Sequence, residues 1–127
     1  MKVRISGNSL RFRISRSDLA SLQADARVET TLHFGPGPGA SFTYALERSA
    51  SAMTVSTRCV PGGVTVLLPA AQANEWNATD KVGIYESIDV GSAGRLDLIL
   101  EKDFACLDGT DAQNADTFPN PAADAGC

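Results

Sequence analysis

The sequence has one histidine and three cysteines, too few to form the familiar metal and nucleophile motifs. No C-x-x-C pair, H-E-x-x-H or G-x-S-x-G occurs, although zinc sites, metalloproteases and serine hydrolases depend on such spacings. These absences argue against the common enzyme classes. We therefore predict no cofactor and no catalytic residue.

The sequence also lacks a long apolar run and an excess of basic residues. No stretch approaches the roughly 18 apolar residues that a membrane-spanning helix requires. The net charge of −4 argues against a general nucleic-acid binder, which is normally basic. The opening MKVRISGNSLRFRIS alternates like a strand and has no signal-peptide core. We expect a cytoplasmic protein without nucleic-acid or membrane partners, whose cysteines are free thiols.

The chain has 127 residues, of which 43% are hydrophobic, and this suits one globular domain. Residues 1–104 read as a single α+β domain. Residues 105–127 are rich in aspartate and proline and have little apolar periodicity. They are predicted to form an irregular acidic strap, anchored by Phe118 and folded back on the domain.

The first sixteen residues predict a hairpin that turns at Gly7-Asn8. Glycine suits the positive φ at the first position of a type II′ turn. This register places Arg4 opposite Arg11 and Val3 opposite Phe12. It keeps the apolar side chains on one face and the basic side chains on the other.

The rest of the chain predicts two short helices and five or six further strands. Ser15 and Asp18 form a capping pattern for a helix over residues 16–25, and Pro69 suits the first position of a second helix around the buried Trp76. The closely spaced strands, in the order ββαββββαββ, predict seven or eight strands in a mainly antiparallel sheet or partly closed barrel.

Two internal hairpins are expected around GPGPGA and around Gly62-Gly63. The first is predicted to pair Phe34 with Phe42 and Leu32 with Tyr44, which would keep the aromatic side chains together on the core side. The second is predicted to pair Cys59 with Val66 and Thr57 with Leu68. Cys59 would then be a buried, inert thiol.

The basic face of the first hairpin is the leading candidate site. Like charges opposite each other destabilise a sheet, so an anion is expected nearby. The anion can be an external phosphate, carboxylate or acidic protein partner, since guanidinium groups bind these in a bidentate manner. It can also be supplied by the protein's own Asp97, Glu101 and Asp103. The candidate anion-binding residues are Lys2, Arg4, Arg11 and Arg13.

A second candidate is a metal- or thiol-dependent site formed by Cys106, Cys127 and His33. The two cysteines flank a segment rich in oxygen ligands, but their spacing matches no zinc pattern. His33 has no orienting acid close to it along its strand. An open sheet edge would also permit a homo-oligomer.

Several stretches resemble a family of small uncharacterised bacterial proteins with a domain of unknown function. They are MKVRISGNSLRFRIS at the start, TDKVGI in the middle, and LILEKDFACL with DTFPNP near the end. The resemblance spans nearly the whole chain and implies a cytoplasmic single-domain protein without implying an activity. The leading functional hypothesis is a non-enzymatic binding or interaction module.

Overall fold

The computed structural model describes residues 1–105 and 115–119. Eight strands and two α-helices in this part of the chain follow the order ββαββββαββ, as predicted. The chain divides into two compact units. One contains Met1–Leu19 and the chain from Val82 onward, and the other contains Ala20–Lys81.

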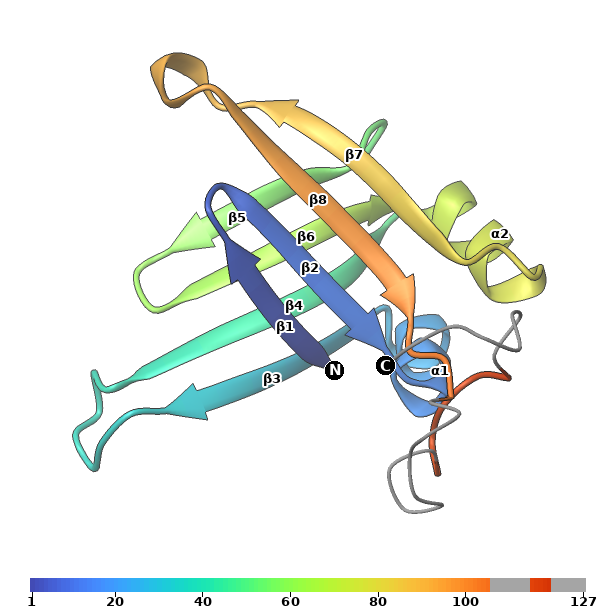
Figure 1. Ribbon diagram of the computed structural model, residues 1–127, viewed down its shortest axis with the longest axis horizontal. Helices are drawn as coiled ribbons and strands as arrows, with labels where there is room; N and C mark the ends of the chain where they lie inside the picture. The colour runs from blue at the N-terminus through green and yellow to red at the C-terminus, as the bar shows by residue number, and fades with distance from the viewer. Residues whose placement is uncertain (106–114, 120–127) are drawn as a thin grey trace. The chain divides into compact units, whose positions relative to one another are not determined.

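The first unit contains a four-stranded sheet, which we call sheet A. Its order is β1 (Lys2–Ser6), β2 (Ser9–Ile14), β8 (Arg95–Lys102) and β7 (Gly83–Asp89) (Figure 1). The outer pairs β1·β2 and β7·β8 are antiparallel hairpins, and the central pair β2·β8 is parallel. Two hairpins from opposite parts of the chain therefore form one sheet.

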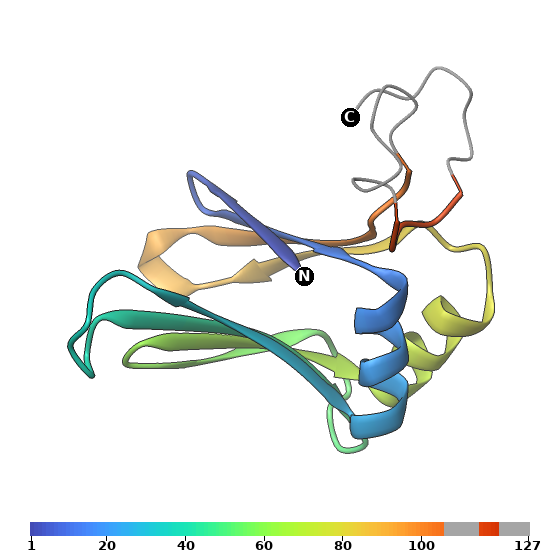
Figure 2. The same ribbon diagram turned by 90° about the horizontal axis from the view of Figure 1, so that it is seen from below.

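The second unit repeats this plan in sheet B. Its order is β3 (Arg27–His33), β4 (Ser41–Ser49), β6 (Gly63–Pro69) and β5 (Ser56–Val60). The hairpins β3·β4 and β5·β6 are antiparallel, and the parallel pair β4·β6 joins them. Figure 2 shows the strands of each sheet side by side in an open layer.

The architecture corrects the prediction of a mainly antiparallel sheet or partly closed barrel. Both sheets are mixed, and neither closes, because β1 and β7 remain edge strands in sheet A and β3 and β5 in sheet B. The α+β class and the two helices were predicted correctly, and the eight strands agree with the predicted seven or eight. The parallel pairings have no local sequence signature, since they join strands separated by other elements.

The register predicted for the first hairpin is confirmed at all five positions, including Arg4 opposite Arg11 and Val3 opposite Phe12. Gly7 takes a φ of 57°, as a type II′ turn requires. Alternation then places the basic side chains on the outer face and buries Leu10, Phe12 and Ile14.

The registers predicted for the other two hairpins were wrong by two residues. Leu32 pairs with Phe42, which leaves Phe34 beyond the ladder and 71% exposed. Cys59 pairs with Val64 instead of Val66, close to the end of edge strand β5, and is exposed. The second turn uses Pro61-Gly62 because proline has no N–H for the ladder, and Gly62 accepts a φ of 81°.

The helices match their sequence signals closely. Helix α1 spans Arg16–Asp25, and Ser15 and Asp18 exchange backbone-to-side-chain hydrogen bonds at its start. Helix α2 spans Ala70–Ala78, and Pro69 is its N-cap residue instead of its first helical residue. Trp76 is fully buried, as predicted. Among the described residues, no helix is long and apolar enough to cross a membrane.

The described part of the closing segment packs within the first unit. The Phe118 ring packs edge-to-face on Phe104 with centroids 6.0 Å apart, and Phe118 also exchanges backbone hydrogen bonds with Asp103 and Ala105. Asp116 accepts hydrogen bonds from Ser17, and these lower the pKa of its carboxyl group. The remainder of the predicted strap lies outside the described residues.

Candidate functional site

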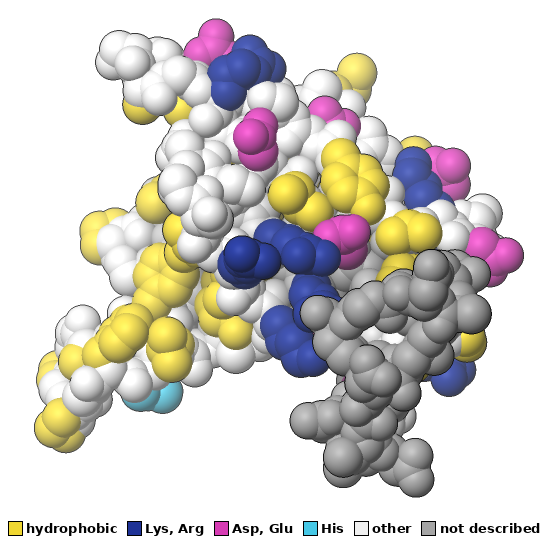
Figure 3. Space-filling model, viewed as in Figure 1, with side chains coloured by type: hydrophobic (Ala, Val, Ile, Leu, Met, Phe, Trp, Pro, Cys, Tyr) yellow, Lys and Arg dark blue, Asp and Glu magenta, His cyan; other side chains and the backbone are white. Residues whose placement is uncertain are grey.

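The outer face of sheet A collects the basic residues that the sequence singled out. Lys2 and Arg4 point outward from β1, and Arg11 and Arg13 do so from β2, because alternate residues of a strand share a face. Figure 3 shows Lys and Arg side chains gathered over β1 and β2, with an acidic side chain and apolar side chains beside them. We call this outer surface of β1 and β2 the basic face.

Two arginines of β2 pair with carboxylates of the neighbouring strand. Arg11 Nε lies 2.7 Å from Glu101 Oε1, and Arg13 Nη2 lies 2.9 Å from Asp103 Oδ1. In the parallel register Arg11 lies opposite Ile99 and Arg13 lies opposite Glu101, so each arginine reaches the acid two residues further along. The protein's own acids therefore neutralise part of the basic face.

Asp103 binds two of the four cations. Its side chain is only 7% exposed, and its second oxygen lies 2.9 Å from Lys2 Nζ. A carboxylate this deeply buried is strongly destabilising unless cations and hydrogen-bond donors surround it. Lys2 and Arg13 are thus committed to Asp103 and have a structural role.

Arg4 differs from the other three cations. Within the described residues its side chain has no ion pair or hydrogen bond, and its Cα partner across the hairpin is Arg11. A shallow hollow of about 160 Å³ is lined by Lys2, Val3, Arg4, Arg11 and Arg13. Four cations thus surround the hollow, and only two carboxylates, Glu101 and Asp103, form ion pairs with them among the described residues.

Arg11 keeps an unused donor despite its ion pair. Its Nε is buried, and within the described chain its N–H makes no hydrogen bond. The 2.7 Å contact with Glu101 is consequently electrostatic and is not aligned as a hydrogen bond. The Arg11 side chain is 35% exposed, so the other nitrogens of its guanidinium group can face solvent or a ligand.

The structure adds Tyr85 to this surface, a residue that the sequence reasoning missed. Its hydroxyl donates a hydrogen bond of 2.9 Å to Glu101. Partial burial raises the pKa of Tyr85, and the hydrogen bond and negative charge of Glu101 raise it further, whereas Arg11 acts in the opposite direction. The alternation of GIYESID could have revealed it, because Tyr85 stands at an outward position beside the inward Ile84.

The other candidates do not assemble into a site in the described part of the chain. His33 is exposed at the end of β3, and no cluster of three or more histidine, cysteine or acidic residues is found in residues 1–105 and 115–119. Cys106 and Cys127 lie outside the described residues. Asp97, which was expected to neutralise the basic face, has no ion pair with a described residue.

Comparison with known proteins supplies a family but no activity. No curated protein and no solved structure shows significant similarity to the chain. One family model, described as a family of unknown function (DUF7009), matches residues 1–122 and so spans both compact units, as expected for one small domain. The chain belongs to this family of unknown function, which confirms the resemblance seen in its opening and closing motifs.

Proposed function

We propose that the protein is a binding module that holds an anionic group on the basic face, between Arg4 and Arg11. The single observation that carries the proposal is Arg4, a cation without a described partner that stands opposite a second arginine at the rim of a hollow. An anion there would relieve the repulsion between the two guanidinium groups and accept charge-assisted hydrogen bonds from both.

The ion pairs leave Arg4 and Arg11, of the four predicted residues, as candidates for binding an external anion. Lys2 and Arg13 hold the buried Asp103, so removing either one leaves a carboxylate without part of its compensation. Arg4 can be removed without breaking an interaction found among the described residues. Arg11 shares its charge between Glu101 and the hollow.

Calorimetric titration with inorganic phosphate at low salt tests the proposal. Arg4→Ala should weaken phosphate binding by about tenfold or more, because a hydrogen bond to a charged group contributes roughly 1.5–3 kcal/mol. Arg58→Ala is the matched control, since Arg58 pairs with Glu47 on sheet B and does not line the hollow. Equal phosphate affinity in the native protein and the Arg4→Ala variant would refute the anion site.

Glu101→Gln gives a second test, in which phosphate affinity should rise instead of fall. Glu101 competes with any external anion for Arg11, since its carboxylate lies 2.7 Å from the guanidinium group. Its neutralisation should strengthen phosphate binding, and higher salt should weaken binding in both proteins because the site is partly exposed.

A further inference from the structure

The outer face of sheet A continues beyond the basic face as an ordered grid. The strand registers align its outward side chains in rows that run across the four strands. The row through the hollow consists of Arg4, Arg11, Ile99 and Tyr85, and the row beside it consists of Ser6, Ser9, Asp97 and Ser87. One row thus changes from cationic to apolar, while the other carries hydroxyl and carboxylate oxygens.

Three shallow hollows follow these rows without a break. The cationic hollow shares Arg4 and Arg11 with a second hollow of about 220 Å³, which also touches Ser6. The second shares Ser9 and Ile99 with a third of about 380 Å³ that reaches Tyr85. The tract crosses three strand spacings from β1 to β7, a distance of about 14 Å. Its length exceeds what an inorganic anion would occupy.

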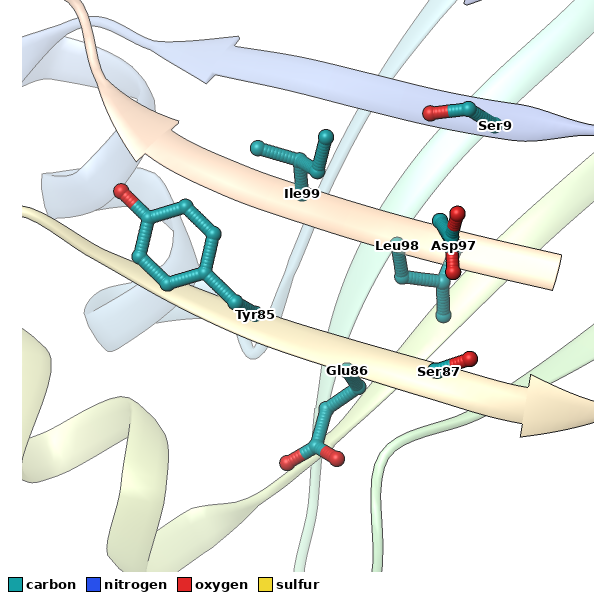
Figure 4. A pocket seen from close by; sticks show the side chains of 7 residues that line it. All are labelled: Ser9, Tyr85, Glu86, Ser87, Asp97, Leu98 and Ile99. Atoms are coloured by element: carbon teal, nitrogen blue, oxygen red, sulfur yellow. The ribbon is translucent and has the colours of Figure 1, made fainter.

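The third hollow has a flat apolar part and a polar part. Figure 4 shows the Tyr85 ring and Ile99 toward one end, and Ser9, Asp97 and Ser87 on three adjacent strands toward the other. Tyr85 is 57% exposed, so one surface of its ring is available for stacking. The hydroxyl of Tyr85 is already bonded to Glu101, which fixes the orientation of the ring.

The polar row selects for ligand groups that donate hydrogen bonds. Among the described residues, the side chains of Ser6, Ser9 and Asp97 have no hydrogen-bond or ion-pair partner, whereas Ser87 accepts a bond of 2.8 Å from Arg95. The Asp97 carboxylate only accepts hydrogen bonds, so it favours a ligand with hydroxyl groups and disfavours a plain acyl chain.

We infer that the tract binds an anionic sugar, a hydroxyl-bearing ring attached to a carboxylate or a phosphate. The anionic group lies between Arg4 and Arg11, the face of a sugar ring stacks on Tyr85 and Ile99, and ring hydroxyls donate to Asp97 and Ser9. This inference rests on the proposed function, because the anion site supplies the charged end of the tract.

Titration with two families of probes tests the inference. Digalacturonate and a hexose phosphate carry both features, acetate and inorganic phosphate carry only the anion, and a neutral disaccharide carries only the sugar. We expect each anionic sugar to bind at least about fivefold more tightly than its simple anion, the gain that ring stacking alone would give. The stronger of the two anionic sugars identifies the natural charged group as carboxylate or phosphate.

Variants at the far end separate the two parts of the tract. Tyr85→Ala should abolish the extra affinity for anionic sugars and leave the affinity for the simple anions unchanged within about twofold. Tyr85→Phe is the matched control and should retain most of the extra affinity, since it keeps the ring that forms the stacking surface and removes only the hydroxyl that orients it. Asp97→Asn, which preserves the side-chain shape, should reduce binding of the sugars alone. Melting curves of all variants verify that the fold is intact.

The outcomes separate this inference from the proposed function. If simple anions bind through Arg4 but the sugar ring adds nothing, or if Tyr85→Ala and Tyr85→Phe behave alike, the anionic-sugar inference is wrong and the anion site stands. If a neutral disaccharide binds as tightly as digalacturonate, the inference is wrong, while binding of phosphate through Arg4 would still support the anion site. If no anion binds, the proposed function is wrong and the inference fails with it.

Discussion

Glu101 is the residue through which the two halves of the outer face of sheet A influence each other. Its carboxylate pairs with Arg11 on the cationic side and accepts a hydrogen bond from Tyr85 on the apolar side. A change at Glu101 therefore alters both the competition for Arg11 and the ionisation of Tyr85. The second effect can be measured without any ligand.

Glu101→Gln should lower the pKa of Tyr85 toward its ordinary value of about 10. The pKa should remain above that value, because partial burial of Tyr85 is the largest cause of its elevation and persists in the variant. Titration of tyrosinate absorbance measures the change. Tyr85→Phe identifies which of the two tyrosines in the chain gives the signal.

Arg11→Gln provides a control of opposite sign for the tyrosine titration. Arg11 lowers the pKa of Tyr85 in the native protein, so its neutralisation should raise that pKa. A raised pKa means that the fold favours the protonated phenol. This contribution to stability is present below the ordinary pKa and is lost as the pH rises through the folded pKa. A Tyr85 pKa that is unchanged in both variants would disprove the electrostatic link.

Among the secondary-structure elements, β7 depends on the single glycine at its start. A Cβ atom added at Gly83 would clash with the Leu100 carbonyl oxygen and would lie only 3.0 Å from both the Tyr85 hydroxyl and a Glu101 side-chain carbon. The lack of a side chain leaves the space in which Tyr85 reaches across to Glu101. Gly83 therefore shapes both the β7·β8 ladder and the position of the aromatic ring.

Gly83→Ala should lower the free energy of unfolding by roughly 1–3 kcal/mol, the usual cost of forcing extra atoms into a packed site. The variant should also lower the pKa of Tyr85, because the added methyl displaces its hydroxyl from Glu101. Denaturant unfolding and tyrosine titration measure the two effects. Gly39→Ala is the matched control, since no atom lies within 4 Å of its Cβ position, and it should change stability by less than about 1 kcal/mol.

The elements differ in how well the sequence predicted them, and the difference follows the range of the interactions. The first hairpin and α1 were predicted to the residue because a Gly7 turn and a Ser15–Asp18 cap each depend on neighbouring residues. The β5·β6 hairpin was predicted two residues out of register because Pro61-Gly62 and Gly62-Gly63 are both plausible turns. Only the missing proline N–H distinguishes them.

The parallel pairs were beyond the reach of local patterns. The sequences of these strands contain no signature of the β2·β8 or β4·β6 pairing, so the strand order of the two sheets could not be predicted from the sequence. The same limit applies to the candidate site. Charge alternation predicted that Arg11 and Arg13 could meet the acids of the last strand, but the inclusion of Tyr85 depends on the β7·β8 register.

At the scale of the whole molecule, the two units differ in the sequence separation between the two strands of their central parallel pairs. The β4·β6 pair joins residues about 20 positions apart, whereas β2·β8 joins residues about 90 positions apart. Closing the longer loop costs roughly 1.3 kcal/mol more in chain entropy. The unit that carries the candidate site is thus the one that must bring together two segments distant in sequence, β2 and β8.

Refolding should accordingly protect the amides that bond β4 to β6 before those that bond β2 to β8, because pairings between distant residues form late. Pulse-labelling hydrogen exchange during refolding from denaturant measures this order. The β1·β2 and β7·β8 hairpins are local and serve as internal controls, since their cross-strand amides should not share the delay. Protection of β2·β8 at the same time as β4·β6, or earlier, would contradict the prediction. Tyr85 and the arginines of the basic face would then be brought together no later than sheet B forms.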